Sequence, residues 1–151
     1  MPNWCEGTLK VRGTKENLTR FMLEALQPVG LLGEDRGKLS LNEYGDIYSS
    51  ETCWIENTRR GFVDKPEVYL SDYEDDEIEI ATFSARFAWG ISAEELLKTC
   101  IEYHVDMKIH GFEKGMEFNQ IIEIVDGQII KDEEIEFSDY KWDCICPELG
   151  G

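Results

Sequence analysis

The chain has 151 residues, 42% of them hydrophobic and 11% aromatic, which is enough apolar material for one packed domain. It carries 32 acidic and 15 basic residues, a formal net charge of −17, and such a field repels nucleic acid and anionic membranes. No apolar run approaches the ~18 residues that span a bilayer, and the start does not resemble a secretory leader. We therefore expect a single cytoplasmic domain over residues 1–151.

The first two predicted elements are a strand and a helix. Residues 4–12 alternate between apolar and polar side chains, as in a strand with one face in the core. Thr14 is a suitable N-cap for the next element. Apolar residues then recur at helical spacing over residues 18–26, and Pro28 is expected to end this helix.

The middle of the chain gives the weakest pattern. Residues 36–66 are mostly irregular, and a long insert of this kind is a common place for function. Within it, residues 42–62 contain a candidate pocket lined by Tyr44, Tyr48 and Trp54.

Residues 68–89 predict a long hairpin. Apolar residues occupy even positions at Ile78 and Ile80, but odd positions from Phe83 to Trp89. Since a strand alternates with a period of two, we expect a bulge between these two phases. Trp89 is expected to share the core face of the strand.

The segment 83–103 gives the clearest local signal, a strand that turns directly into a helix. Gly90 breaks the alternation, and Ser92 then occupies the position of a helix N-cap. Glu95, three residues later, has the spacing of a capping box. These residues predict a helix over 93–103.

Three further strands are predicted, over residues 105–109, 116–125 and 128–137. Asp126-Gly127 joins the last two and is a strong signal for a two-residue type I′ turn. No period is found from Ser138 onward, so we expect a flexible tail.

With a short strand at Leu39 and Leu41 counted in brackets, the predicted order is β-α-(β)-β-β-α-β-β-β. This order indicates an α+β protein with an antiparallel sheet and two helices on one face. A ferredoxin-like (split βαβ) topology, extended by extra hairpin strands, fits this order best.

The opening Pro2-Asn3-Trp4-Cys5, followed by a strand that ends at Gly13, resembles the start of the YubB-type ferredoxin-like domain family. These are small proteins carried by phages, plasmids and conjugative elements. The strand that ends at Trp89 and the later HGFEKGMEFNQ hairpin are similar to the second half of that family. Gly90-Ile91 stands where the family often has a proline pair. The resemblance covers most of residues 1–130, implies a fold and a mobile-element setting, and carries no mechanism.

Candidate chemistry is sparse. Cys144-x-Cys146 offers two thiolates, but a structural zinc site needs four ligands and no second pair is present. The two histidines, His104 and His110, have no nucleophile at motif spacing. We therefore expect no catalytic residue, no metal and no cofactor.

The negative charge is concentrated in two stretches. Residues 64–80 hold eight acids and one base, and residues 123–148 hold nine acids and two bases. The candidate protein-interaction residues are Asp72, Glu74, Asp75, Asp76 and Glu77. We expect a non-catalytic accessory factor with a protein partner, which the charge predicts to be basic, and no direct contact with nucleic acid or membrane. A homo-oligomer is compatible with the sequence.

Two alternatives stay open. One is a DNA mimic, an antirestriction-like inhibitor that offers its carboxylates to a basic DNA-handling protein. The other is a small ligand-binding domain or enzyme that uses residues 42–62. Convergence of the aromatic residues of this insert on a concave site would favour the second alternative.

Overall fold

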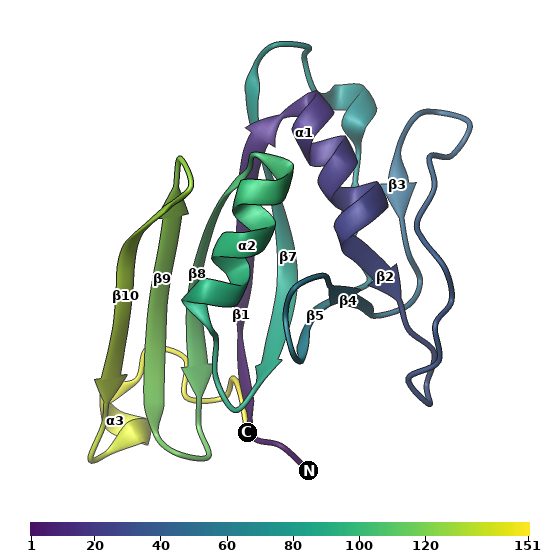
Figure 1. The fold of residues 1–151 in the computed structure, drawn as a ribbon. Helices are drawn as coiled ribbons and strands as arrows, with labels where there is room; N and C mark the ends of the chain where they lie inside the picture. The colour runs from purple at the N-terminus through teal and green to yellow at the C-terminus, as the bar shows by residue number, and fades with distance from the viewer.

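Residues 1–151 are described by a computed structural model with an α+β fold (Figure 1). A large antiparallel sheet has eight strands in the order β10-β9-β8-β1-β7-β5-β4-β2, and a second sheet pairs β3 with β6. The strands are β1 (Trp4–Thr14), β2 (Leu26–Pro28), β3 (Ile47–Tyr48), β4 (Cys53–Ile55), β5 (Gly61–Asp64), β6 (Glu67–Val68), β7 (Ile78–Ala88), β8 (Asp106–Glu113), β9 (Phe118–Val125) and β10 (Gln128–Glu136). The helices are α1 (Lys15–Arg20), α2 (Ala93–Tyr103) and α3 (Tyr140–Asp143), with a π-helical turn at Phe21–Ala25 and a 3₁₀ turn at Leu70–Asp72.

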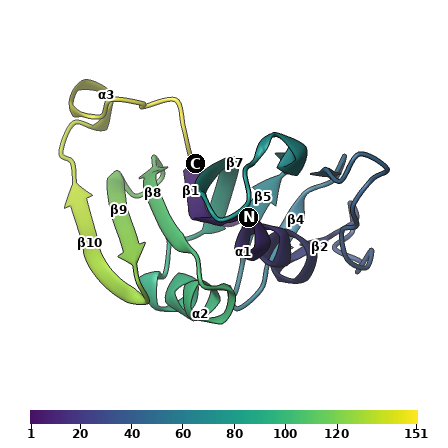
Figure 2. The same ribbon diagram turned by 90° about the horizontal axis from the view of Figure 1, so that it is seen from above.

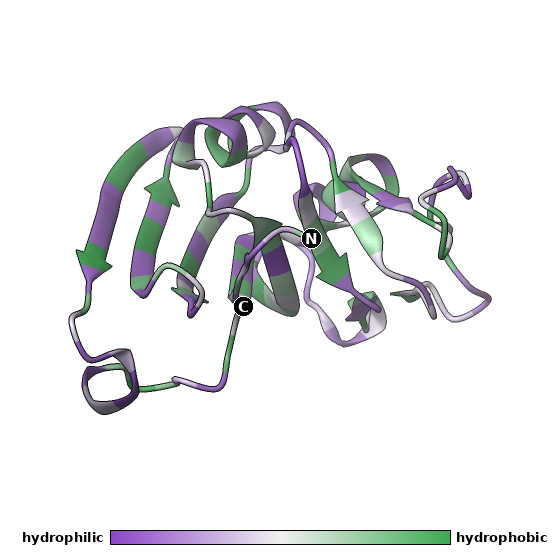
Figure 3. Ribbon diagram, turned by 90° about the horizontal axis from the view of Figure 1, so that it is seen from below, coloured by the Kyte–Doolittle hydropathy of each residue, from purple (hydrophilic) through white to green (hydrophobic).

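β1 lies at the centre of the large sheet. It pairs with β7 over its whole length, from Trp4↔Ala88 to Thr14↔Ile78, and with β8 on its other side. Successive side chains of a strand point to opposite faces, and the colour bands along the strands in Figure 3 show this alternation of hydrophobic and hydrophilic residues. One face of these strands is therefore buried, and the other is called the open face below.

The core lies against the buried face. It is one cluster of 28 buried side chains, to which the sheet and the first two helices contribute. Phe21 is fully buried, and its ring centroid lies 6.3 Å from those of Phe83 on β7 and Tyr103 on α2. Phe21 therefore links the sheet to α2. No helix of the structure combines the length and the apolarity needed to cross a lipid bilayer.

The hairpin expected over residues 68–89 is wrong, and so is its bulge. β7 pairs with β1 and β5, while β6 pairs with β3 instead. The register between β1 and β7 is continuous, so β7 has no bulge. Ile78 and Ile80 therefore lie on the open face, where they are exposed, and do not point into the core. β7 ends at Ala88, and Trp89, expected in the core, has a φ of 67° and is 62% exposed.

The first helix begins as predicted but ends early. The Thr14 side chain accepts a hydrogen bond from the Asn17 backbone N–H at 3.2 Å. The helix then widens into the π-helical turn, and Leu26, expected on its apolar stripe, begins β2, which pairs with β4. Leu26 is fully buried, so its apolar character reflects burial in a strand.

Residues 36–66 contain more regular structure than expected. They hold β3, β4 and β5, and the last two extend the large sheet beyond β7. Strands of two to four residues are too short to show an alternation in the sequence, which is why the prediction missed them.

The second half of the chain agrees closely with the prediction. α2 spans residues 93–103, and the Ser92 side chain accepts a hydrogen bond from the Glu95 backbone N–H at 3.3 Å. The Glu95 carboxylate does not complete the capping box; it accepts the Arg59 backbone N–H at 3.1 Å. Asp126 and Gly127 have φ values of 51° and 69°, as a type I′ turn requires.

Residues 138–151, expected as a flexible tail, contain α3 and then return to β1. Tyr140 and Cys144 are buried against Phe112, and the Gly151 N–H donates to the Trp4 carbonyl at 3.0 Å. Figure 2 shows this segment on the side of the sheet opposite α2. It covers one end of the open face and brings the two termini together; its flexibility stays a prediction.

Candidate functional site

The open face gathers aromatic rings and basic side chains beside the N-terminus of β1. β1, β7 and β5 are neighbours in the sheet, and Phe62 is the register partner of Arg86. The rings of Trp4 and Phe62 meet edge to face, with centroids 6.1 Å apart. Three residues distant in the sequence are therefore adjacent on one surface.

Two guanidinium groups lie over the same indole ring. The Cζ atoms of Arg86 and Arg60 are 4.9 Å and 5.6 Å from the Trp4 ring centroid, within the ~6 Å range of a cation–π contact. Neither arginine forms an ion pair with a carboxylate. Two positive charges without a carboxylate partner therefore lie within about 6 Å of one ring, where an anion could pair with them.

A groove of about 530 Å³ opens beside this ring, and we call it the Trp4 groove. The loop over residues 29–33 and the segment 50–52 form its other walls. Its charged lining residues are the basic Arg36, Arg60, Lys65 and Arg86 and the acidic Glu51. Glu51 already pairs with Arg36 at 3.3 Å. Arg36 also pairs with Glu34 at 2.9 Å. The charged groove residues that remain unpaired are Arg60, Lys65 and Arg86, and all three are basic.

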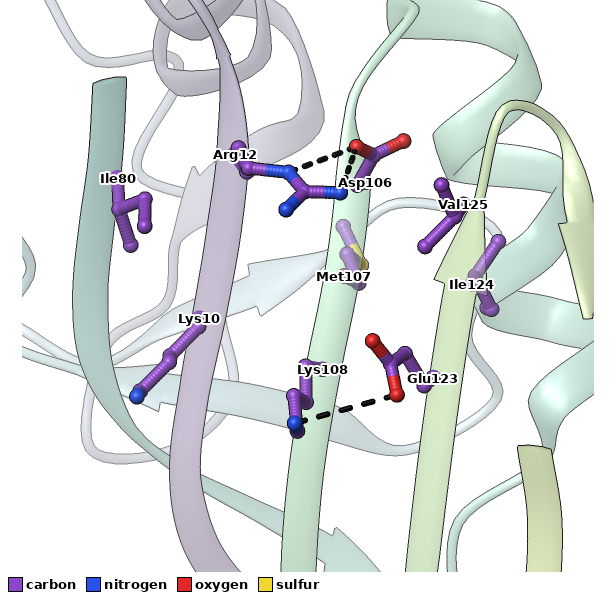
Figure 4. A pocket seen from close by; sticks show the side chains of 9 residues that line it. All are labelled: Lys10, Arg12, Ile80, Asp106, Met107, Lys108, Glu123, Ile124 and Val125. Atoms are coloured by element: carbon purple, nitrogen blue, oxygen red, sulfur yellow. Dashed lines mark hydrogen bonds and ion pairs between the residues drawn. The ribbon is translucent and has the colours of Figure 1, made fainter. Parts of the chain in front are cut away.

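A smaller hollow of about 180 Å³ lies farther along the open face, across β1, β8 and β9 (Figure 4). Arg12 Nη2 is 2.7 Å from Asp106 Oδ2, and the second oxygen of Asp106 accepts the Asp126 backbone N–H at 3.0 Å. Lys108 and Glu123 face each other at 3.9 Å. These ion pairs and hydrogen bonds link neighbouring strands. Since most of the charged side chains in the hollow are already paired, few remain to bind a ligand.

The five acidic residues predicted as an interaction site lie in the loop before β7. All are exposed: Asp72, Glu74, Asp75, Asp76 and Glu77. Lys15 Nζ is 4.0 Å from Asp75 Oδ1. In Figure 1 this loop is at the top of the molecule, whereas the second acidic stretch begins at β9 and continues along β10 at the far edge of the sheet. The two stretches are therefore separate surfaces.

β10 is an exposed edge strand. It has nine residues, and its outer backbone edge pairs with no other strand. Its acidic residues are Asp132, Glu133, Glu134 and Glu136, all exposed. The opposite edge, β2, has three residues and ends in Pro28, which has no N–H to donate. β10 is therefore the longer free edge of the large sheet.

The three aromatic residues predicted to line a pocket lie in different parts of the fold. Tyr44 is in a loop and Tyr48 is on β3, with exposed fractions of 73% and 64%. Trp54 is on β4 of the large sheet, and its Nε1–H donates to the Thr58 carbonyl at 2.9 Å. The insert nevertheless contributes to a concave site, because residues 50–52 line the Trp4 groove.

All five cysteines are free, and four are buried. Burial raises the pKa of the Cys5 thiol to about 12, and the nearby Glu113 carboxylate adds to this shift. Burial likewise raises the pKa of Cys100 to about 12. Both side chains therefore stay neutral thiols near pH 7 and are poor nucleophiles. No group of three or more His, Cys, Asp or Glu side chains is placed to hold a metal ion.

The polar residues beneath the C-terminal segment centre on Asn119. Its Oδ1 accepts from the Tyr140 hydroxyl at 3.1 Å and lies 3.6 Å from Cys144 Sγ, while its Nδ2 lies 3.3 Å from His110 Nε2. Burial lowers the pKa of His110, which favours the neutral ring. Cys144 and His110 both contact Asn119 rather than each other, so they do not form a nucleophile–base pair.

We expect Cys146 to be the cysteine that a thiol reagent modifies in the folded chain, because the other four are buried. Titration with a chromogenic disulfide near neutral pH should show one fast thiol, and the remaining four only after unfolding in urea. A Cys146→Ser variant should lose the fast phase. Fast modification of Cys5 or Cys100 in that variant would contradict the burial described here.

Comparison of the chain with protein-family models, with curated proteins and with solved structures gives no match. The geometry of the described residues is therefore the basis for inferring a function. Sequence reasoning missed Trp4, Arg60 and Arg86 as a group, because nothing local indicates that β1 and β7 are neighbours. The one sequence signal was the basic pair Arg59-Arg60 beside Phe62 in an acidic chain.

Proposed function

We propose that this chain is a non-catalytic protein-binding factor that captures a basic segment of a partner along β10. The observation that carries the proposal is the nine-residue acidic edge strand with a free backbone edge. A strand added to this edge gains main-chain hydrogen bonds, and basic side chains on it meet the carboxylates of β10. Pairing with β10 of a second copy is opposed, because like charges would face each other.

The charge of the whole chain supports the same partner class. A net charge of −17 raises the encounter rate with basic proteins and lowers it for polyanions. The DNA-mimic form of the proposal needs carboxylates spread along one elongated surface. The loop before β7 and β10 lie apart in Figure 1, and this separation favours strand addition over the mimic.

We further propose that the centre of the sheet is a ferredoxin-like unit. The support is the strand order β8-β1-β7-β5, all pairs antiparallel, with α1 following β1 and α2 following β7. Both helices lie opposite the C-terminal segment in Figure 2. Membership of the YubB-type family and a mobile-element setting are proposals of the same kind, which rest on the opening residues 2–5, the strand that ends at Trp89 and the HGFEKGMEFNQ hairpin. A cytoplasmic location is a separate proposal, and it rests on the lack of an apolar run of bilayer length in the sequence.

Charge reversal on β10 tests the proposed function. We expect the Glu133→Lys, Glu134→Lys double variant to bind a fluorescein-labelled peptide of alternating lysine and valine about tenfold more weakly, because attraction becomes repulsion. Fluorescence anisotropy at low and physiological salt measures the affinity.

The matched control is Asp75→Lys, Asp76→Lys, which makes the same charge change in the loop before β7. This control should keep most of the affinity. Loss of binding in the control alone would move the interaction site to the acidic loop, and equal loss in both variants would show that only net charge matters. Either result contradicts strand addition at β10.

A further inference from the structure

The Trp4 groove departs from the charge balance of the chain. Four of the 15 basic residues line it, with one of the 32 acidic residues. Arg60 and Arg86 face the Trp4 ring rather than a carboxylate, although carboxylates are twice as numerous as basic groups. This arrangement fits an anionic ligand better than a structural ion-pair network.

The geometry of the two arginines favours a phosphate among anions. Each guanidinium is a planar fork that can donate two parallel hydrogen bonds to phosphate oxygens. The Trp4 ring holds both forks on the open face, and Lys65 at the groove wall adds a third unpaired positive charge. A dianionic phosphate matches the charge of both arginines, whereas a single carboxylate matches only one.

The rest of the groove is suited to a flat apolar group. Phe62 lies half-buried on one wall, and Val29 and the fully exposed Leu31 lie on another. A volume of about 530 Å³ falls within the range of roughly 300–1,000 Å³ that is usual for small-molecule sites. A ligand that joins a phosphate to an aromatic ring fills both parts.

We infer that the Trp4 groove binds a free nucleotide, with its phosphate between Arg60 and Arg86 and its base against Phe62. A polynucleotide shares this chemistry, but its further phosphates would extend over a chain of net charge −17 and be repelled. The base and one phosphate group therefore carry the affinity, and chain length adds nothing. This site is on the open face and is independent of the binding proposed at β10.

The test is titration of the full chain with the four ribonucleoside 5′-monophosphates, followed by NMR at the Trp4 indole N–H, which a Trp4→Phe variant assigns. We expect saturable shifts of this signal with at least one nucleotide, and an affinity about tenfold lower in the Arg60→Gln, Arg86→Gln variant, which loses both forks. Arg59→Gln is the matched control, since Arg59 is an exposed neighbour that does not line the groove. It should bind as the parent chain does, and all variants should show the parent's circular dichroism spectrum.

Four outcomes would overturn the inference. One is the absence of shifts at millimolar nucleotide, and another is an equal loss of affinity in the Arg59→Gln control. The third comes from the ligand series: inorganic phosphate that binds as tightly as a nucleotide removes the role of the base. In the same series, a single-stranded oligonucleotide that binds about tenfold tighter per site than the mononucleotide assigns the groove to nucleic acid instead.

Discussion

A Gly7→Ala variant is expected to lose about 3 kcal/mol or more of its unfolding free energy, a large part of the total for a domain of this size. Gly7 lies in β1, where a Cβ atom would overlap the carbonyl oxygen of His110 and lie 3.3 Å from the Gly111 Cα on β8. These are backbone atoms of a strand that β1 and β9 hold on both sides. The clash therefore cannot be relieved by a side-chain rotation.

Urea denaturation followed by circular dichroism measures this loss. Gly13→Ala, in the same strand, is the matched control, because its Cβ would first meet the Val105 side chain at 3.2 Å, and that side chain can shift. We expect a much smaller loss for the control. Equal stability of the two variants would contradict the close approach of the β1 and β8 backbones.

The second large effect is expected at Phe21. Phe21→Ala removes a fully buried ring that contacts Phe83 and Tyr103, and the cavity it leaves should lower the unfolding free energy by about 3–5 kcal/mol. Phe21→Leu keeps most of the volume and should lose less.

The same urea denaturation measures these variants, with Leu31→Ala as a surface control, since Leu31 is 103% exposed. A loss of unfolding free energy below about 1 kcal/mol for Phe21→Ala would mean that the π-helical turn at Phe21–Ala25 does not pack on the sheet.

Local signals in the sequence predicted the elements that carry their own start and stop residues. Ser92 and Glu95 mark the first turn of α2, and Asp126-Gly127 marks the turn between β9 and β10. The helix cap and the two-residue turn each involve no more than four consecutive residues, so the local sequence is enough to determine their geometry.

Pairing between distant strands could not be predicted in the same way. The alternation over residues 78–88 is compatible with any neighbour, and the hairpin prediction chose the nearest one, although β7 pairs with β1. The Trp4 groove has the same origin, because its walls come from the N-terminus, the 29–36 loop, the 50–52 and 60–65 segments, and Arg86. No single window of the sequence contains enough of these residues to indicate a site.

The central position of β1 has a consequence for how the chain reaches its native state. Residues 4–14 are synthesised before their partners, residues 78–88 and 106–113, so the central strand is made before the strands on either side of it. Contacts of such long sequence separation slow folding, and sheets of this kind form on the order of milliseconds to seconds. On the ribosome, the apolar side chains of this strand stay without their partners until most of the chain has emerged, a period in which nascent chains are exposed to aggregation and to chaperones.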